Sequence, residues 1–115
     1  ATGLLAGLAH PQIAKVIQAL HSTPARSWTT EDMAQIVLMS RSKFSPLFKQ
    51  ILGQTPLDYL TQWRVNLAQQ LLLAGKPVGF VANEVGYDSS STLSRAFQKT
   101  TQMSPKVWLN SVNSD

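Results

Sequence analysis

Hydroxyl and cationic side chains gather in two stretches of the chain that contain no acidic residue. The stretches are residues 41–55 and 89–114, and each contains three basic residues. Serine hydroxyls and Lys or Arg cations donate hydrogen bonds to phosphate oxygens, and the planar fork of Arg can engage two acceptors at once. Such charges can also simply keep a helix face soluble. In a protein of net charge +4, the two stretches are candidate surfaces for an anionic partner.

The two stretches repeat each other at an interval of 49 residues. Residues 44–50 align with 93–99, and residues 55–60 align with 104–109. Two copies are too few for a solenoid. What recurs is a short apolar helix, a tight turn and a second helix with one apolar face and one hydroxyl-and-cation face. This order is the layout of a helix-turn-helix.

Helical spacing divides the second helix of each copy into an inner and an outer face. The inner faces are centred on Phe44 and Phe48 in the first copy and on Leu93 and Phe97 in the second. The outer faces are predicted to carry Ser42, Ser45, Pro46 and Lys49, with Arg41 added for its charge, and Ser91, Ser94, Arg95 and Gln98, with Lys99 at the edge. Any amphipathic helix has one polar side, but two matched and net positive sides favour DNA as the partner.

Hydrophobic periodicity and capping residues predict an all-α chain of about seven helices and no strand. A first helix-turn-helix unit is expected over residues 10–54, a connector helix over 55–75 and a second unit over 76–115. The connector has roughly 18 helical residues, which corresponds to a length of about 27 Å. Residues 1–9 are too short to span a membrane and are expected to form a flexible segment or a linker remnant.

Composition argues against an enzyme and against metal or cofactor binding. The chain has no cysteine, so it has neither a disulfide framework nor a thiolate ligand, which fits a cytoplasmic protein. His10 and His21 lack the spacing of a metal site, and neither has an evident acidic partner for catalysis. Glycine-rich phosphate loops are also missing. We therefore predict no catalytic residue, no cofactor and no metal.

Four runs of residues carry a family resemblance. They are Trp28-Thr29-x-Glu31-Asp32-Met33-Ala34, Met39-Ser40-Arg41-Ser42-x-Phe44-Ser45-x-x-Phe48-Lys49, Gly53-x-Thr55-Pro56-x-x-Tyr59-Leu60-x-x-Trp63-Arg64-x-x-x-Ala68-x-x-Leu71-Leu72 and Val81-Ala82-x-x-Val85-Gly86-Tyr87-x-Ser89-x-Ser91-x-Leu93-Ser94-Arg95-Ala96-Phe97-x-Lys99. Over about residues 28–109 the chain resembles the DNA-binding domain of AraC/XylS-type transcription regulators. The resemblance implies two helix-turn-helix units joined by a long helix, with one helix of each unit inserted into successive major-groove segments. It also implies a double-stranded DNA operator as partner, RNA polymerase as a partner of the full-length regulator, and a monomeric isolated domain.

The resemblance also implies which positions contact DNA. They are Ser42, Ser45 and Pro46 in the first unit and Ser90, Ser91, Ser94 and Arg95 in the second. Pro46 stands where the family usually has Arg, and it removes both a cation and a helical N–H group. Two outcomes stay open: the first unit reads DNA more weakly than the second, or its second helix bends or restarts there with Ser45 as its cap. Leu38 stands where the family usually has a turn glycine.

The sequence thus predicts sequence-specific binding to double-stranded DNA by a transcription regulator. One alternative stays open, a helical protein–protein interaction module whose apolar stripes dock a partner without DNA. Salt dependence separates the two, because neutralised phosphates release counterions and make DNA binding weaken steeply with salt.

Overall fold

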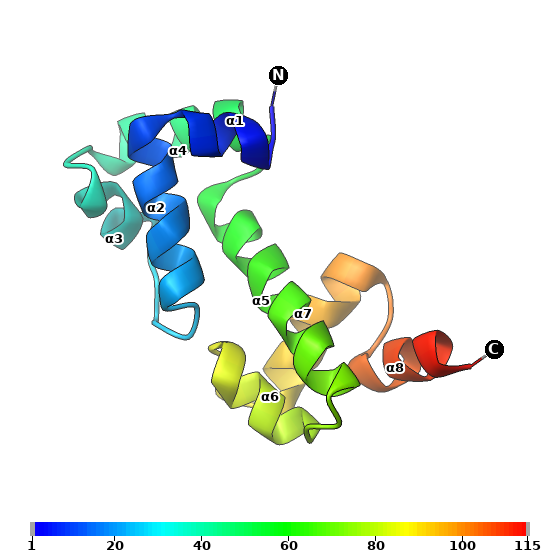
Figure 1. Cartoon of the computed structure of the whole chain (residues 1–115). Helices are drawn as coiled ribbons and strands as arrows, with labels where there is room; N and C mark the ends of the chain where they lie inside the picture. Colours follow the sequence, from blue (N-terminus) through cyan, green and yellow to red (C-terminus); the bar gives the residue numbers. More distant parts are fainter. Residues whose placement is uncertain (1, 115) are drawn as a thin grey trace. The chain divides into compact units, whose positions relative to one another are not determined.

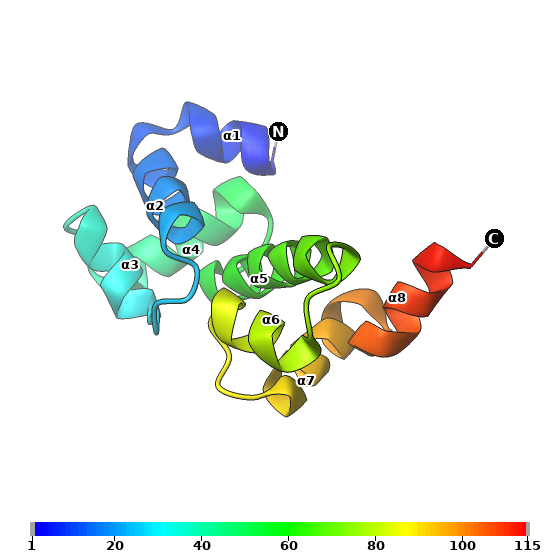
Figure 2. The same ribbon diagram turned by 60° about the horizontal axis from the view of Figure 1, so that its bottom comes forward.

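The computed structural model describes residues 2–114, and every regular element in this range is a helix. The eight helices are α1 (Leu4–Ala9), α2 (Pro11–Ser22), α3 (Thr30–Ile36), α4 (Arg41–Leu52), α5 (Pro56–Leu73), α6 (Val78–Val85), α7 (Ser90–Thr101) and α8 (Pro105–Asn113) (Figures 1 and 2). The all-α class is confirmed. The residues group into unit 1, residues 1–60, and unit 2, residues 61–115, with the boundary inside α5. The predicted division into two units and a separate connector stays a prediction.

The eighth helix lies in the segment that we expected to be flexible. Leu4–Ala9 form α1, which packs on α2 and α4 within unit 1 (Figure 1). Gly7 is buried at this contact, and a Cβ atom there would lie 2.8 Å from both Ile17 Cδ1 and Leu52 Cδ2. The expectation of flexibility is therefore wrong for residues 4–9, because a close approach through glycine docks them. Residue 1, which the same expectation covered, lies outside the described residues.

Unit 1 encloses a core built from α2, α3, α4 and the start of α5. The Nδ1 atom of His10 accepts from the Ile13 N–H at 3.3 Å, which fixes the first turn of α2. The apolar stripe of α2 is then completely enclosed, with Val16 and Leu20 at 0% exposure. The buried set is Ile13, Val16, Ile17, Leu20, Trp28, Met33, Ala34, Val37, Phe44, Phe48, Leu52, Tyr59 and Leu60. Phe44 and Phe48 anchor α4 in this core and so determine which side of α4 faces out.

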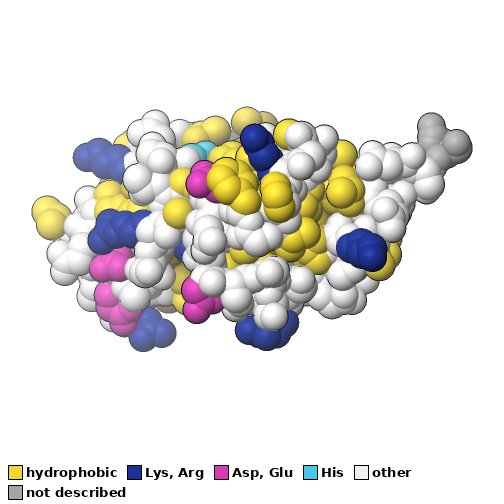
Figure 3. All heavy atoms as spheres, turned by 90° about the horizontal axis from the view of Figure 1, so that it is seen from below, with side chains coloured by type: hydrophobic (Ala, Val, Ile, Leu, Met, Phe, Trp, Pro, Cys, Tyr) yellow, Lys and Arg dark blue, Asp and Glu magenta, His cyan; other side chains and the backbone are white. Residues whose placement is uncertain are grey.

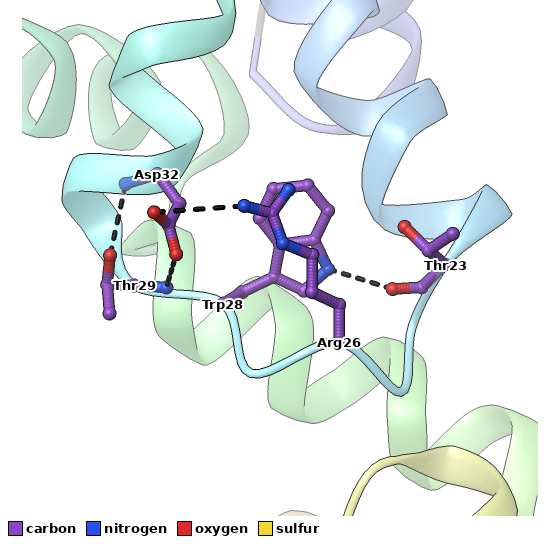
Figure 4. Close-up of polar contacts among 5 residues, drawn as sticks. All are labelled: Thr23, Arg26, Trp28, Thr29 and Asp32. Carbon is purple, nitrogen blue, oxygen red and sulfur yellow. Dashed lines mark hydrogen bonds and ion pairs between the residues drawn. The ribbon is translucent and has the colours of Figure 1, made fainter.

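The loop before α3 is held by the contacts that Figure 4 shows. Thr29 and Asp32 form a reciprocal capping box, with N–H to oxygen distances of 3.0 and 3.1 Å. The Trp28 indole N–H donates to the Thr23 carbonyl at 2.8 Å. The Arg26 guanidinium lies over the same indole, 4.2 Å from the ring centre, and pairs with Asp32 at 3.8 Å. These contacts fix the start of α3, and thereby the first helix of the unit 1 helix-turn-helix.

His21, in the last turn of α2, is joined to Tyr59, in the first turns of α5. The distance from His21 Nε2 to the Tyr59 hydroxyl is 2.6 Å, and the two rings stack with centres 5.9 Å apart. Tyr59 also packs edge-on against Phe48. Burial lowers the pKa of His21 below its ordinary value of 6.5, because removing water disfavours the charged imidazolium.

This lowered pKa makes the stability of unit 1 sensitive to mild acid. As the pH falls, His21 takes up its proton in the unfolded chain before it does so in the folded protein. The free energy of unfolding therefore decreases from about pH 6.5 downwards, until the pH has passed the lower pKa of the folded state. We expect the urea midpoint to be lower at about pH 5 than at about pH 7.5, and the drop to be smaller in His21→Gln. Glutamine keeps a side-chain nitrogen near Tyr59 but does not titrate. Equal drops in the two proteins would contradict the prediction.

Unit 2 encloses a second, smaller core. It consists of Val65, Ala68, Leu72, Val81, Ala82, Val85, Leu93 and Phe97, all buried. Phe97 of α7 meets Trp108 of α8 edge-on, with ring centres 5.6 Å apart. Ser104 caps α8 by accepting from the Val107 N–H at 3.2 Å. Leu93 and Phe97 anchor α7 as Phe44 and Phe48 anchor α4.

The turns of the two helix-turn-helix units have the same hydrogen bonds but different residues at the left-handed position. In unit 1 the Met39 N–H donates to the Ala34 carbonyl at 3.0 Å, and in unit 2 the Tyr87 N–H donates to the Ala82 carbonyl at 2.8 Å. The residue before the donor has a positive φ in both, 56° at Leu38 and 111° at Gly86. Glycine adopts such angles without steric cost, whereas a side chain does not. The Leu38 side chain is 91% exposed, so little packing offsets this cost.

Placing glycine at position 38 and leucine at position 86 should change the free energy of unfolding in opposite directions. We expect Leu38→Gly to raise the free energy of unfolding by about 1 kcal/mol and Gly86→Leu to lower it by about 1–2 kcal/mol. Urea unfolding of both variants and the parent protein measures these changes. A destabilised Leu38→Gly would mean that Leu38 contributes contacts outweighing its backbone strain.

Candidate nucleic-acid interface

Helix α4 presents the first set of predicted contact residues. Its N-cap is Ser40, whose hydroxyl accepts from the Lys43 N–H at 3.3 Å, and its C-cap is Gly53 at a φ of 85°. With Phe44, Phe48 and Leu52 buried, the opposite side turns outward. The predicted residues lie there: Arg41, Ser42, Pro46 and Lys49 are exposed and Ser45 is half-buried.

Pro46 lies inside α4, and the helix neither ends nor restarts there. The helix is continuous from Arg41 to Leu52 with Ser40 as its cap, so the alternative in which Ser45 begins a new helix is wrong. At this interior position the proline ring cannot donate to the Ser42 carbonyl one turn earlier. The outward side of α4 therefore carries a helix-weakening residue at its centre.

Helix α7 presents the second set in the same way. Ser89 is its N-cap and accepts from the Thr92 N–H at 3.2 Å, while Gln102 ends the helix at a φ of 62°. Leu93 and Phe97 are buried. On the remaining side, Ser90, Ser91, Arg95 and Lys99 are exposed and Ser94 is half-buried. Contact of either set with DNA stays a prediction, but each helix holds its predicted set away from the core.

A chain of side-chain hydrogen bonds surrounds Arg95. Its Nη2 atom donates to the Thr92 hydroxyl at 3.3 Å, and that hydroxyl donates to Asp88 Oδ1 at 3.2 Å. The Ser89 hydroxyl lies 3.0 Å from the Thr92 hydroxyl. Neither Thr92 nor Asp88 was predicted from the sequence as a functional residue. Thr92 lies three residues before Arg95 on α7, and this interval is the signal that could have drawn attention to it. Asp88 lies in the turn before α7.

The cations of unit 1 are not all equally available. Arg41 Nη1 lies 3.2 Å from Glu31 Oε2 on α3, so the charge of Arg41 is shared with a carboxylate. Lys43 and Lys49 are exposed on α4. On the face that Figure 3 shows, some of the Lys and Arg side chains lie beside acidic side chains. In unit 1, Lys43 and Lys49 are therefore better placed to attract phosphate than Arg41, whose charge is shared with Glu31.

The described residues offer little support for other kinds of site. Within residues 2–114 no cluster of three His, Cys, Asp or Glu side chains could hold a metal ion. No helix in that range combines the length and the apolar character that crossing a membrane requires.

The chain is similar to several bacterial regulators in sequence. Residues 33–111 match the helix-turn-helix domain family. A putative AraC-like transcription regulator of Streptomyces lividans is 46% identical over 105 residues, which cover 90% of this chain and 34% of that protein. The transcriptional regulator AlkR of Acinetobacter baylyi is 43% identical over 103 residues, which cover 89% and 34%. The chain thus spans about a third of the length of these relatives.

Solved structures give the same result. The C-terminal domain of AraT, a response regulator from Geobacillus stearothermophilus, has a TM-score of 0.83 at 29% identity, covering 89% of this chain and 86% of that one. The DNA-binding domain of the global transcriptional factor AdpA, solved in complex with a target DNA, has a TM-score of 0.81 at 27% identity, covering 88% and 92%.

Proposed function

Because the chain belongs to the AraC family of helix-turn-helix transcription regulators, we propose that it reads double-stranded DNA by inserting α4 and α7 into successive major-groove segments. The family is one of DNA-binding regulators and not of enzymes. The observation that carries the proposal is the matched outward side of the two helices. Each helix follows the tight turn of a helix-turn-helix, buries large apolar residues, three in α4 and two in α7, and turns serine hydroxyls and cations to solvent.

The side chains on the outward sides of α4 and α7 suit different kinds of DNA contact. Short serine side chains such as Ser42 and Ser91 let a helix lie deep in the groove and can bond to either a base or a phosphate. Arg95 can bond a guanine through both of its fork nitrogens, whereas Lys49 and Lys99 act as point charges for phosphates. Only unit 2 places an arginine at this central position, since Pro46 takes it in unit 1. We propose that unit 2 supplies more of the base discrimination.

The likeness to longer regulators also supports proposals about the full-length protein. We propose that the full-length regulator acts in the cytoplasm, recognises an operator through this domain and contacts RNA polymerase, and that the isolated domain is monomeric. The support is the likeness to curated transcription regulators of which this chain matches about a third.

Selection from a random-sequence pool of duplexes tests the proposal. We expect the chain to enrich one motif, and the enriched duplex, hereafter the selected duplex, to be protected in two major-groove segments on one face. Affinity should fall linearly with salt on a double logarithmic plot, with a slope of about −0.9 for each neutralised phosphate. No enrichment, together with salt-insensitive binding to a protein partner, would favour the interaction-module alternative.

A pair of lysine variants locates the interface. Lys49 is exposed on α4, and Lys15 is exposed on α2, away from both proposed reading helices in sequence. We expect Lys49→Ala to reduce the salt slope by about 1 and Lys15→Ala to leave it unchanged. The reverse result would place the DNA on a different side of unit 1.

A further inference from the structure

Arg95 is exposed on α7, yet its guanidinium already has a side-chain partner. Its Nη2 atom donates to the Thr92 hydroxyl at 3.3 Å. A long, exposed arginine populates many rotamers, and fixing one of them on binding costs free energy. A partner that favours one rotamer beforehand lowers that cost and restricts the bases that the fork can reach.

The Thr92 hydroxyl is arranged to accept from Arg95. A hydroxyl has one proton and two acceptor positions. Thr92 gives its proton to Asp88 Oδ1 at 3.2 Å, which leaves its lone pairs for the Arg95 Nη2 and for the Ser89 hydroxyl at 3.0 Å. Donation to a carboxylate also makes the hydroxyl oxygen a stronger acceptor, because hydrogen bonds in a chain polarise one another.

This arrangement is specific to unit 2. At the repeat interval of 49 residues, Thr92 and Arg95 correspond to Lys43 and Pro46. Asp88 has no counterpart in unit 1, because Met39 corresponds to Tyr87 and the turn of unit 2 is one residue longer. These positions of unit 1 contain no carboxylate, no hydroxyl and no guanidinium, so they cannot form the same chain. The caps are nevertheless the same, because Ser40 accepts from the Lys43 N–H and Ser89 accepts from the Thr92 N–H. The helix start therefore needs the backbone of residue 92 but not its hydroxyl.

We infer that Thr92, oriented by Asp88, is a positioning residue that holds Arg95 in the rotamer that discriminates one base pair of the operator. The inference rests on the proposed function, since it assigns a supporting contact to a proposed DNA-reading side chain. It concerns base discrimination and not overall affinity. The hydroxyl acts through Arg95.

The test compares the selected duplex with copies of it in which each base pair is changed in turn. We expect Thr92→Val to reduce discrimination by about twofold to tenfold at the base pair that Arg95→Ala also relaxes, and to leave the other pairs unchanged. Valine keeps the branched shape and the capping N–H but removes the hydroxyl. Thr92→Ser should restore discrimination. Thr100→Val, which makes the same chemical change near the other end of α7, should have no effect.

A double-mutant cycle completes the test. In an Arg95→Ala background, Thr92→Val should cause no further loss at that base pair. Suppose that Arg95→Ala reduces discrimination at one base pair, while Thr92→Val reduces the affinity for all duplexes equally or for none. The positioning role of Thr92 is then overturned, and the proposed function stands. If Arg95→Ala relaxes no pair while DNA binding persists, the reading role of Arg95 and the inference both fall. The positioning role of the Thr92 hydroxyl would also be overturned if Thr92→Ser lost as much discrimination as Thr92→Val.

Discussion

Replacing Pro46 by arginine is expected to raise both the thermal stability of the protein and its affinity for duplex DNA. Pro46 lies in the interior of the continuous helix α4, where proline costs about 3 kcal/mol or more. The substitution restores the N–H donor to the Ser42 carbonyl and removes the ring from the preceding turn. It also adds a cation to the side of α4 that carries Ser42 and Lys49. Melting temperature and affinity for the selected duplex, measured on the same preparation, report the two effects.

Pro46→Ala separates the backbone effect from the charge effect. Alanine repairs the helix without adding a cation, so we expect it to give most of the stability gain and little of the affinity gain. Affinity of Pro46→Arg should also have the steeper salt dependence of the two. If both variants lose stability and DNA binding, Pro46 shapes a local geometry of α4 that binding needs, and the strain argument fails.

Most of the fold was accessible from sequence because the helices carry local signals. The stripe of Ile13, Val16, Ile17 and Leu20 has the helical period, and all four are buried. Ser40, Ser89 and Ser104 each accept from an N–H three residues later, as N-cap residues do. These signals depend only on neighbours along the chain. They therefore appear before any tertiary structure is known.

Helix α1 was missed because its signal is tertiary. Its sequence, LLAGLA, has no polar side and too few residues to show a period. What docks it is the missing side chain of Gly7 against Ile17 and Leu52, which are distant in sequence. The turn at Leu38 shows the converse. The sequence shows that Leu38 replaces the family's usual turn glycine, but only the φ of 56° shows that leucine keeps the left-handed conformation there.

The candidate site also has features that local sequence signals predict and features that they do not. Helical spacing alone placed Ser42, Pro46 and Arg95 away from the core, and the structure exposes them. Spacing could not show that Arg41 shares its charge with Glu31, ten residues earlier and on another helix. Nor could it choose among the possible partners of Arg95, since side chains three and four residues away on either side are all within reach.

Replacing Arg95 by alanine is expected to have the largest effect on base discrimination. Arg95 is the arginine on the outward side of α7, with its fork held by Thr92 at 3.3 Å. A bidentate contact to one base contributes about 1–3 kcal/mol of discrimination. We therefore expect Arg95→Ala to weaken binding to the selected duplex by that amount and to relax preference at one or two base pairs. Pool selection with the variant, followed by titration of single-pair changes, measures both.

Arg95→Lys distinguishes a base contact from a phosphate contact. Lysine keeps the positive charge but lacks the planar fork, so it should preserve much of the salt slope while discrimination at the affected pair falls. If Arg95→Ala instead weakens binding equally on all sequences and lowers the salt slope by about 1, Arg95 contacts a phosphate. Sequence selectivity would then have to come from the serine hydroxyls of α4 and α7 or from the shape of the duplex, because a phosphate contact carries no direct sequence information.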